Sequence, residues 1–183
     1  MNIHKLVEEL GYELESIKPT VGTSGVVYFL EEDKVLKITD DENEISVAKK
    51  LIGSSPEYLA KIYEIHDMGD CHVIIREKIN GLSLKDVENY EEYDKSYYYF
   101  AIYEILYLIG RNLFCKKTRK KSEEEIIAKY GNDKASKWAS GIVNIANEAK
   151  EYGVKYPYDH MYKQNIGIKN GHYACFDLID KEV

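Results

Sequence analysis

Hydrophobic positions along the chain predict a β-rich first part with two short helices. Apolar side chains recur at i, i+3, i+4 and i+7 in residues 3–10, and Gly11 ends this pattern, which predicts a short amphipathic helix. Apolar runs bounded by turn residues predict strands at 12–18 (a weak one), 26–30, 34–39, 61–66 and 71–76. A helix is expected between them at 41–52, with Gly53 at its end.

The pattern turns helical in the second part of the chain. An apolar stripe predicts a long helix at 95–114, a Ser-x-x-Glu sequence starts a short one at Ser122, and Asp133 caps another. We therefore expect an α+β fold class with two lobes, residues 1–80 and residues 81–183.

The last stretch predicts a β-hairpin with polar groups at its open end. Residues 166–169 alternate, and Asn170 and Gly171 form a strong signal for a two-residue turn. Because a hairpin brings its ends together, Asn165 and Asp177 should lie side by side. An amide oxygen and a carboxylate suit Mg²⁺ when phosphates supply the other ligands. The same residues also fit the ordinary polar ends of a solvated hairpin, and both interpretations stay open.

Two charged residues stand among apolar ones in the first part. Lys37 lies inside a predicted strand, where an ammonium needs a partner or a ligand because unpaired burial costs several kcal/mol. Alternation along that strand also allows Lys37 to face solvent, on the side of Val35 and Thr39. Glu44 falls on the apolar stripe of its helix, which predicts an inward carboxylate with Lys37 as the nearest cation. The alternative is a glutamate at the edge of the helix.

Composition narrows the classes of function. A formal charge of -7 over 183 residues argues against a general nucleic-acid binder. The cysteines Cys71, Cys115 and Cys175 are far apart and form no Cys-x-x-Cys pair, which predicts reduced thiols. A signal-peptide pattern and a membrane-spanning run are both missing from the sequence, so we expect a cytoplasmic protein with no membrane partner.

The order of these features resembles the protein-kinase-like superfamily, which includes small-molecule kinases such as the aminoglycoside phosphotransferases. Residues 20–180 contain the features of that superfamily in its order. They are a glycine-containing loop, a strand lysine, a helical glutamate, a connector, helices and a polar loop before a hairpin. Their joint order carries the resemblance. It implies a two-lobe fold, with a small antiparallel-sheet N-lobe plus one helix and a shortened, mostly helical C-lobe.

By resemblance, the first lobe would bind ATP. The loop would cover the phosphates with its backbone N–H groups, Lys37 would hold the α- and β-phosphates with Glu44 as its partner, and the hinge at 76–78 would contact adenine. The residues implied in nucleotide binding are Gly22, Thr23, Ser24, Gly25, Lys37, Glu44, Glu77 and Lys78.

The resemblance places metal and catalytic residues in the second lobe. Asn165 and Asp177 would bind the Mg²⁺ that bridges the phosphates. The catalytic aspartate of the family normally stands five positions before the asparagine, whereas Asp159 is six before it and His160 takes the five-back position. A one-residue bulge restores Asp159 as the base, or His160 replaces it, or the base is missing.

Two departures follow the metal aspartate. Leu178 and Ile179 stand where protein kinases have Phe-Gly, which favours a small-molecule kinase over a regulated protein kinase. The sequence stops at Val183, so the resemblance implies a C-terminally truncated member without the activation segment and the helices that usually bind an acceptor. A small kinase-like protein of this kind would suit a phage or mobile-element gene.

Three functions are compatible with the sequence. The first is a minimal phosphotransferase that uses ATP and Mg²⁺, with Lys37 and Asp159 or His160 in catalysis. The second is a catalytically inactive, pseudokinase-type protein that binds a partner protein, with or without nucleotide. The third is a structural helical module without a ligand. We expect a nucleotide as ligand and a protein as partner or substrate, with no nucleic acid.

Overall fold

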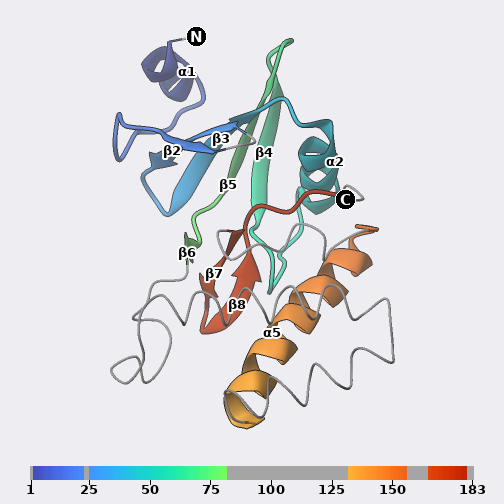
Figure 1. The fold of residues 1–183 in the computed structure, drawn as a ribbon. Helices are drawn as coiled ribbons and strands as arrows, with labels where there is room; N and C mark the ends of the chain where they lie inside the picture. The colour runs from blue at the N-terminus through green and yellow to red at the C-terminus, as the bar shows by residue number, and fades with distance from the viewer. Residues whose placement is uncertain (1, 23–24, 82–131, 156–164, 181–183) are drawn as a thin grey trace. The chain divides into compact units, whose positions relative to one another are not determined.

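The computed structural model describes residues 2–22, 25–81, 132–155 and 165–180, and they form an α+β structure (Figure 1). The chain divides into two compact units. Unit 1 comprises Met1–Pro56 and Ala60–Ile79, and unit 2 comprises Glu57–Leu59 and Asn80–Val183. The helices predicted at 95–114 and from Ser122 lie outside the described residues. Among the described helices, none combines the length and the apolar character needed to cross a membrane.

Unit 1 is built on a five-stranded antiparallel sheet in the order β1-β2-β3-β5-β4. The strands are β1 (Thr20–Gly22), β2 (Gly25–Leu30), β3 (Lys34–Thr39), β4 (Ile62–Asp67) and β5 (His72–Glu77). The last four agree with the strands predicted from the apolar runs to within one residue at each end.

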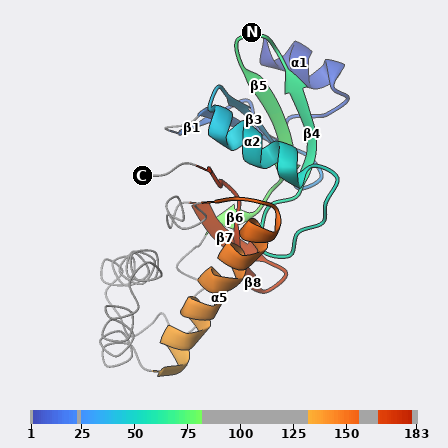
Figure 2. The same ribbon diagram turned by 90° about the vertical axis from the view of Figure 1, so that its right-hand side faces the viewer.

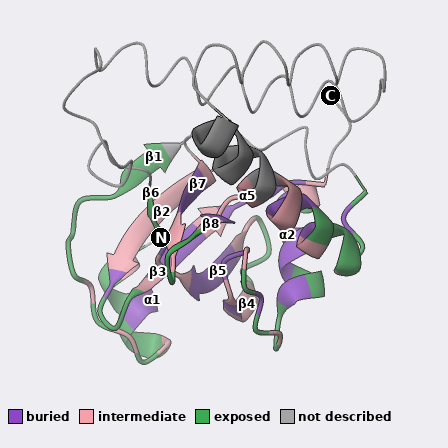
Figure 3. Cartoon of the chain, turned by 90° about the horizontal axis from the view of Figure 1, so that it is seen from below, coloured by how far each residue is buried: buried purple, intermediate pink, exposed green. Residues whose placement is uncertain are grey.

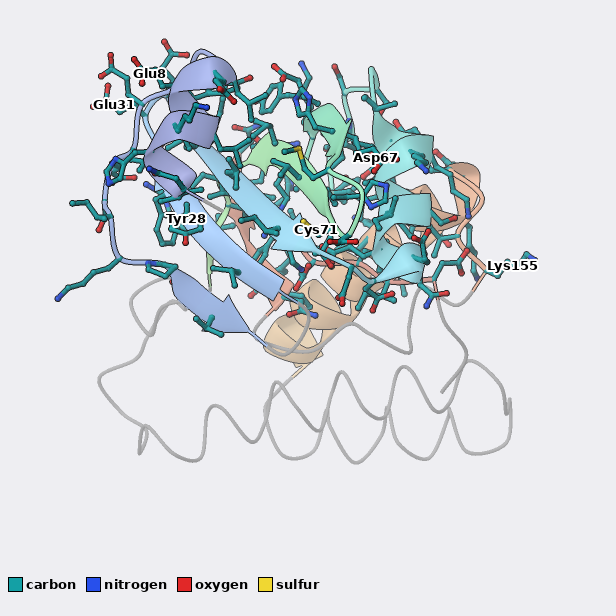
Figure 4. All side chains as sticks on the ribbon, turned by 90° about the horizontal axis from the view of Figure 1, so that it is seen from above. Glu8, Tyr28, Glu31, Asp67, Cys71 and Lys155 are labelled. Atoms are coloured by element: carbon teal, nitrogen blue, oxygen red, sulfur yellow. The ribbon has the colours of Figure 1, made fainter. Side chains whose placement is uncertain are left out.

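Helix α1 (Ile3–Glu9) covers one face of this sheet. The side chain of Asn2 caps it by accepting hydrogen bonds from the backbone N–H groups of the first turn. The helix buries Leu6 and Val7 in one apolar cluster with Leu30, Leu36, Val73 and Ile75. Tyr28 of β2 packs against the same cluster (Figure 4).

Helix α2 (Glu42–Leu51) lies across the opposite face (Figure 2). Asp41 is its N-cap and accepts a hydrogen bond from Asn43 N–H at 2.9 Å. Thr39 in turn accepts from the N–H of Asp41 at 3.2 Å, so the end of β3 fixes where the helix begins. Gly53 follows the helix with φ 76°, a left-handed conformation that suits glycine at a helix end.

Because helices cover both faces, the central strands are buried along their length instead of alternating. Four consecutive residues of β5, from Val73 to Arg76, are buried, and three consecutive residues of β3, from Val35 to Lys37, are buried as well (Figure 3). The alternative that Lys37 faces solvent is therefore wrong, since the alternation rule applies to a sheet with one wet face.

The weak strand predicted at 12–18 is also wrong. In this stretch only Leu14 forms a bridge, with Leu30, and the regular partner of β2 is β1, which had been predicted as part of the glycine loop. Both segments use the same edge of β2, so the chain leaves that edge after Leu14 and returns to it at Thr20.

Unit 2 contains a three-stranded antiparallel sheet in the order β6-β7-β8. The strands are β6 (Asn80–Gly81), β7 (Ile166–Lys169) and β8 (His172–Cys175). The predicted hairpin is confirmed, because Asn170 (φ 50°) and Gly171 (φ 80°) form the two-residue turn in the left-handed region that this turn type requires. Strand β6, only two residues long, was not predicted.

Helix α5 (Asn132–Glu151) packs on β8. Ile145, Ala146 and Ala149 are fully buried along it. A Cβ placed on Gly141 would stand 2.5 Å from the Tyr173 ring, so helix and strand approach each other closely at this point. Of the three cysteines, Cys71 is partly exposed and Cys175 is buried, and no disulfide joins them; Cys115 lies outside the described residues.

Candidate functional site

Lys37 is buried in the middle of the sheet of unit 1. Its cross-strand neighbours are Val27 on β2 and Ile74 on β5, and its side chain is 3% exposed. The Nζ atom lies 2.6 Å from Oε1 of Glu44, whose side chain is 7% exposed. The inward carboxylate that the helical stripe predicted is therefore present, and its cation is Lys37.

The first turn of α2 fixes the position of Glu44. Glu44 is the third residue of the helix, and the contacts from Thr39 through Asp41 set where that helix starts. A carboxylate in the first turn also interacts favourably with the N-terminal end of the helix dipole. The local sequence around the N-cap thus determines that the Glu44 side chain points toward the sheet, where it contacts Lys37.

Gly25 brings the end of the glycine loop against Lys37. Its φ of 139° is a conformation that residues with a side chain rarely adopt. A Cβ on Gly25 would overlap the carbonyl oxygen of Ile38 and would lie 3.5 Å from Cε of Lys37. Gly22, the last residue of β1, pairs with Gly25, the first residue of β2. Thr23 and Ser24 themselves lie outside the described residues.

Two further polar residues are buried on the face of the sheet that carries Lys37. Thr39 is 2% exposed, and Arg76 is 7% exposed opposite Val35. Thr39 was not predicted as a site residue, and Arg76 was predicted only as part of the hinge, not as a buried charge beside Lys37. The signal was available for Arg76, because it ends an apolar run just as Lys37 interrupts one.

Backbone pairing changes the expectation for the hinge. The N–H of Glu77 donates to the carbonyl of Lys61 at 2.9 Å, and the N–H of Lys78 donates to the carbonyl of Asp33 at 2.8 Å. These two donors belong to the sheet, so a nucleotide base would have to contact other backbone groups. The side chain of Lys78 forms an ion pair with Glu15 at 2.6 Å.

The hairpin of unit 2 holds the two predicted metal ligands next to each other. Ile166 pairs with Cys175, and beyond this pair the N–H of Phe176 donates to the carbonyl of Asn165 at 2.9 Å. Asp177 follows directly, and both Asn165 and Asp177 are half-buried. The backbone of Asn165 therefore lies beside that of Phe176, the residue directly before Asp177, at the open end of the hairpin.

The donor set at this end of the hairpin fits Mg²⁺ bound together with phosphate. One amide and one carboxylate are hard oxygen donors, and Mg²⁺ usually takes one or two protein ligands while water and phosphate complete its shell. In the described part of the chain, no group of three or more His, Cys, Asp or Glu gathers into a centre made by protein alone. Asp159 and His160 lie outside the described residues.

Sequence reasoning missed Glu148, whose carboxylate joins α5 to the segment Glu57–Leu59. Its Oε1 accepts from the N–H of Glu57 at 2.7 Å, and its Oε2 accepts from the N–H of Tyr58 at 2.6 Å. Glu148 stands three positions after the buried Ile145 and one before the buried Ala149. Glu44 falls in the middle of its apolar helical stripe, whereas Glu148 falls at the edge of one, so the rule that selected Glu44 does not select Glu148.

No family profile matches the chain, and no curated protein sequence matches it. Among solved structures it is similar to the PknI kinase domain of Mycobacterium tuberculosis, with a TM-score of 0.47, 10% identity, and coverage of 94% of this chain and 61% of that chain. A double mutant of that domain gives a TM-score of 0.46 at the same identity and coverage. The chain thus spans about three fifths of the kinase domain it matches.

Proposed function

We propose that the chain binds ATP with Mg²⁺ and transfers its γ-phosphoryl group as a minimal phosphotransferase of the protein-kinase-like superfamily. The observation that carries the proposal is the buried ion pair between Lys37 and Glu44, with Gly25 of β2 packed beside the Lys37 side chain.

Stability alone is a poor explanation for this pair. Taking two charges out of water costs several kcal/mol each, and replacing a buried ion pair by apolar residues of similar volume is often neutral or stabilising by about 1–4 kcal/mol. A fold that needed only a core at Lys37 and Glu44 would be served as well by methionine and leucine. A role for the ammonium toward an anionic ligand explains why the charge is there.

The surroundings of Lys37 suit a nucleotide phosphate. The strand and the Glu44 carboxylate hold the ammonium in one place, so little side-chain freedom remains to be lost on binding. Gly25 carries no side chain where it packs against the carbonyl of Ile38 and near Cε of Lys37, so the backbone at the start of β2 passes close to the ammonium-bearing side chain. Backbone N–H groups of glycine-containing loops are suited to contact phosphate oxygens.

In this proposal, Asn165 and Asp177 would hold the metal ion, which would neutralise charge on the phosphates when bound. Asp159, or His160 at the position the family uses for its base, would accept the proton of the acceptor. Phosphoryl transfer requires mainly positioning and charge stabilisation from a protein, so this set of residues is chemically sufficient.

A second candidate is a nucleotide-binding protein that does not transfer phosphate and acts by binding a partner protein. The spacing of Asp159, six positions before Asn165, favours it, because His160 then stands at the base position. Lys37, Glu44 and Asp177 would serve binding in both candidates.

Thermal stability with ATP and Mg²⁺ tests nucleotide binding. A ligand that binds the native state at 100 times its Kd stabilises it by about 2.7 kcal/mol, so millimolar ATP should raise the Tm of the wild type. The Tm of Lys37→Met should not respond. An unchanged Tm of the wild type at millimolar ATP would contradict the proposal.

Label transfer from γ-labelled ATP separates the two candidates. Turnover by the wild type that is lost in Asp177→Ala supports the phosphotransferase. Comparison of Asp159→Ala with His160→Ala then identifies the base. ATP binding with no transfer to protein, water or small acceptors would favour the partner-binding candidate.

A further inference from the structure

The residues just before Asp177 are held through a short segment, Glu57–Leu59. The N–H of Cys175 donates to the carbonyl of Tyr58 at 2.9 Å, and Leu59 forms a parallel bridge with Cys175. Lys169 on β7 adds a hydrogen bond from its Nζ to the carbonyl of Leu59 at 3.0 Å. The segment is thus hydrogen-bonded alongside the end of β8, from which the chain continues into Asp177.

Glu148 fixes this segment to α5. Both of its carboxylate oxygens are used, one on the N–H of Glu57 and one on the N–H of Tyr58. Hydrogen bonds from backbone N–H groups to a carboxylate are short and roughly twice as strong as neutral ones. The position of β8 therefore depends on a carboxylate that stands on a different element.

The residues just after Asp177 are hydrogen-bonded to the segment that follows this helix. Leu178 and Ile179 are 6% and 8% exposed, and Oδ1 of Asp180 accepts from the N–H of Lys155 at 2.7 Å. Lys155 follows the end of α5 by four residues, after the buried Val154. A carboxylate consequently ties the chain before Asp177 to α5, and another ties the chain after Asp177 to the segment that directly follows α5.

We infer that Glu148 and Asp180 are positioning residues for Asp177 and that they hold its carboxylate in place for the metal ion. This inference rests on the proposed function, because it assigns Asp177 to metal-assisted nucleotide binding. On this inference, the contacts of Glu148 and Asp180 hold Asp177 in position before a ligand binds. Neither Glu148 nor Asp180 itself contacts the nucleotide or the metal ion.

The test measures how much Mg²⁺ strengthens ATP binding. Kd for ATP is determined by calorimetry with Mg²⁺ and with EDTA, for the wild type, Glu148→Ala, Glu148→Gln and Asp180→Ala. Loss of residues that orient a metal ligand typically weakens metal binding about 10–100-fold. We expect both alanine variants to lose about tenfold or more of the enhancement by Mg²⁺, with Kd in EDTA unchanged.

Conservative variants and a matched control sharpen the result. Asp180→Asn keeps an acceptor oxygen for Lys155 and should restore the enhancement, whereas Glu148→Gln keeps one of two acceptors and should be intermediate. Glu151→Ala changes an exposed glutamate on the same helix and should behave like the wild type. Hydrogen exchange at the Cys175 and Phe176 amides should accelerate in Glu148→Ala.

The outcomes separate the two proposals. If ATP binding by the wild type does not depend on Mg²⁺, the metal role of Asp177 falls, and this inference falls with it. If the wild type shows the enhancement and both alanine variants retain it while their Tm drops, Glu148 and Asp180 only stabilise the fold. In that case this inference is overturned and the proposed function stands.

Discussion

The two units hold their candidate site residues by different means. In unit 1 the charged pair Lys37–Glu44 is enclosed by side chains, between a sheet and a helix, and is less than a tenth exposed. In unit 2 the polar pair Asn165 and Asp177 is half-buried and is placed by backbone hydrogen bonds that lead to Glu148 and Asp180. The first pair is held by the packing of side chains around it, and the second by backbone hydrogen bonds that involve Glu148 and Asp180.

This difference predicts how each region responds to change. A charge enclosed by packing cannot lose its partner without a large cost, because the remaining charge stays buried. Substitution of Glu148 or Asp180 should cost less stability, because neither leaves a charge buried. It should instead displace Asp177 from the position in which it would bind the metal ion. Variants of unit 1 should therefore report on folding and ligand binding together, and variants of Glu148 or Asp180 mainly on binding.

The largest effect is expected at the buried pair. Glu44→Ala leaves Lys37 buried without its carboxylate and should lower the free energy of unfolding by about 3–5 kcal/mol, measured by urea denaturation. The double variant Lys37→Met with Glu44→Leu removes both charges and should recover most of that loss. Recovery that fails in the double variant would mean that the pair stabilises the fold in its own right.

A slightly smaller effect is expected at Gly25. Alanine there combines an unfavourable φ with overlap on the Ile38 carbonyl, and the two costs together amount to about 3 kcal/mol. Gly53→Ala is the matched control, since its φ is also positive but a Cβ would meet nothing within 4 Å, so it should cost about 1 kcal/mol. Equal losses in the two variants would show that the close approach to β3 is absent.

The smallest effect on stability is expected at the partly buried hydrogen bond between Tyr12 and Glu64 in unit 1. The hydroxyl of Tyr12 donates to Glu64. Burial, with this hydrogen bond added, raises the pKa of Tyr12 to about 12, and the hydrogen bond from Tyr12 lowers the pKa of Glu64. Because the contact is only partly buried, Tyr12→Phe should cost about 1 kcal/mol at neutral pH.

The pH dependence of this contact has a definite sign at both ends. Between pH 10 and about 12 the native state keeps the Tyr12 proton that the unfolded chain loses, so stability falls as the pH rises through this window. At the acid end, the lowered pKa of Glu64 gives stability that is present above its ordinary value of 4.5 and lost as the pH falls through the native pKa. Tyr12→Phe should flatten both slopes, and unchanged slopes would contradict the contact.

Much of unit 1 was predictable because its signals are local. Four of the five strands, both helices and the inward direction of Glu44 follow from periodicity and capping residues. The sequence could not decide whether Lys37 was buried, because that depends on the second helix-covered face, which is a tertiary feature. The strand at Thr20–Gly22 was missed for a similar reason, since its pairing with Gly25–Val27 at one edge of β2, next to the bridge from Leu14 to Leu30, is a tertiary contact.

In unit 2 the hairpin was predictable and its anchors were not. The turn residues Asn170 and Gly171 specify the hairpin by backbone conformation alone. Glu148, by contrast, acts on backbone groups some 90 positions earlier in the chain, and no local pattern announces such a contact. Asp180 was overlooked because a carboxylate near the end of a sequence usually faces water.

The central claim is that Lys37 carries its charge for a nucleotide. Calorimetric titration of ATP with Mg²⁺ into the wild type and into the Lys37→Met, Glu44→Leu double variant tests this most directly, because the double variant should remain folded. We predict saturable binding to the wild type and none to the double variant at the same concentrations. Equal binding by both proteins, or an absence of binding by the wild type, would contradict the account.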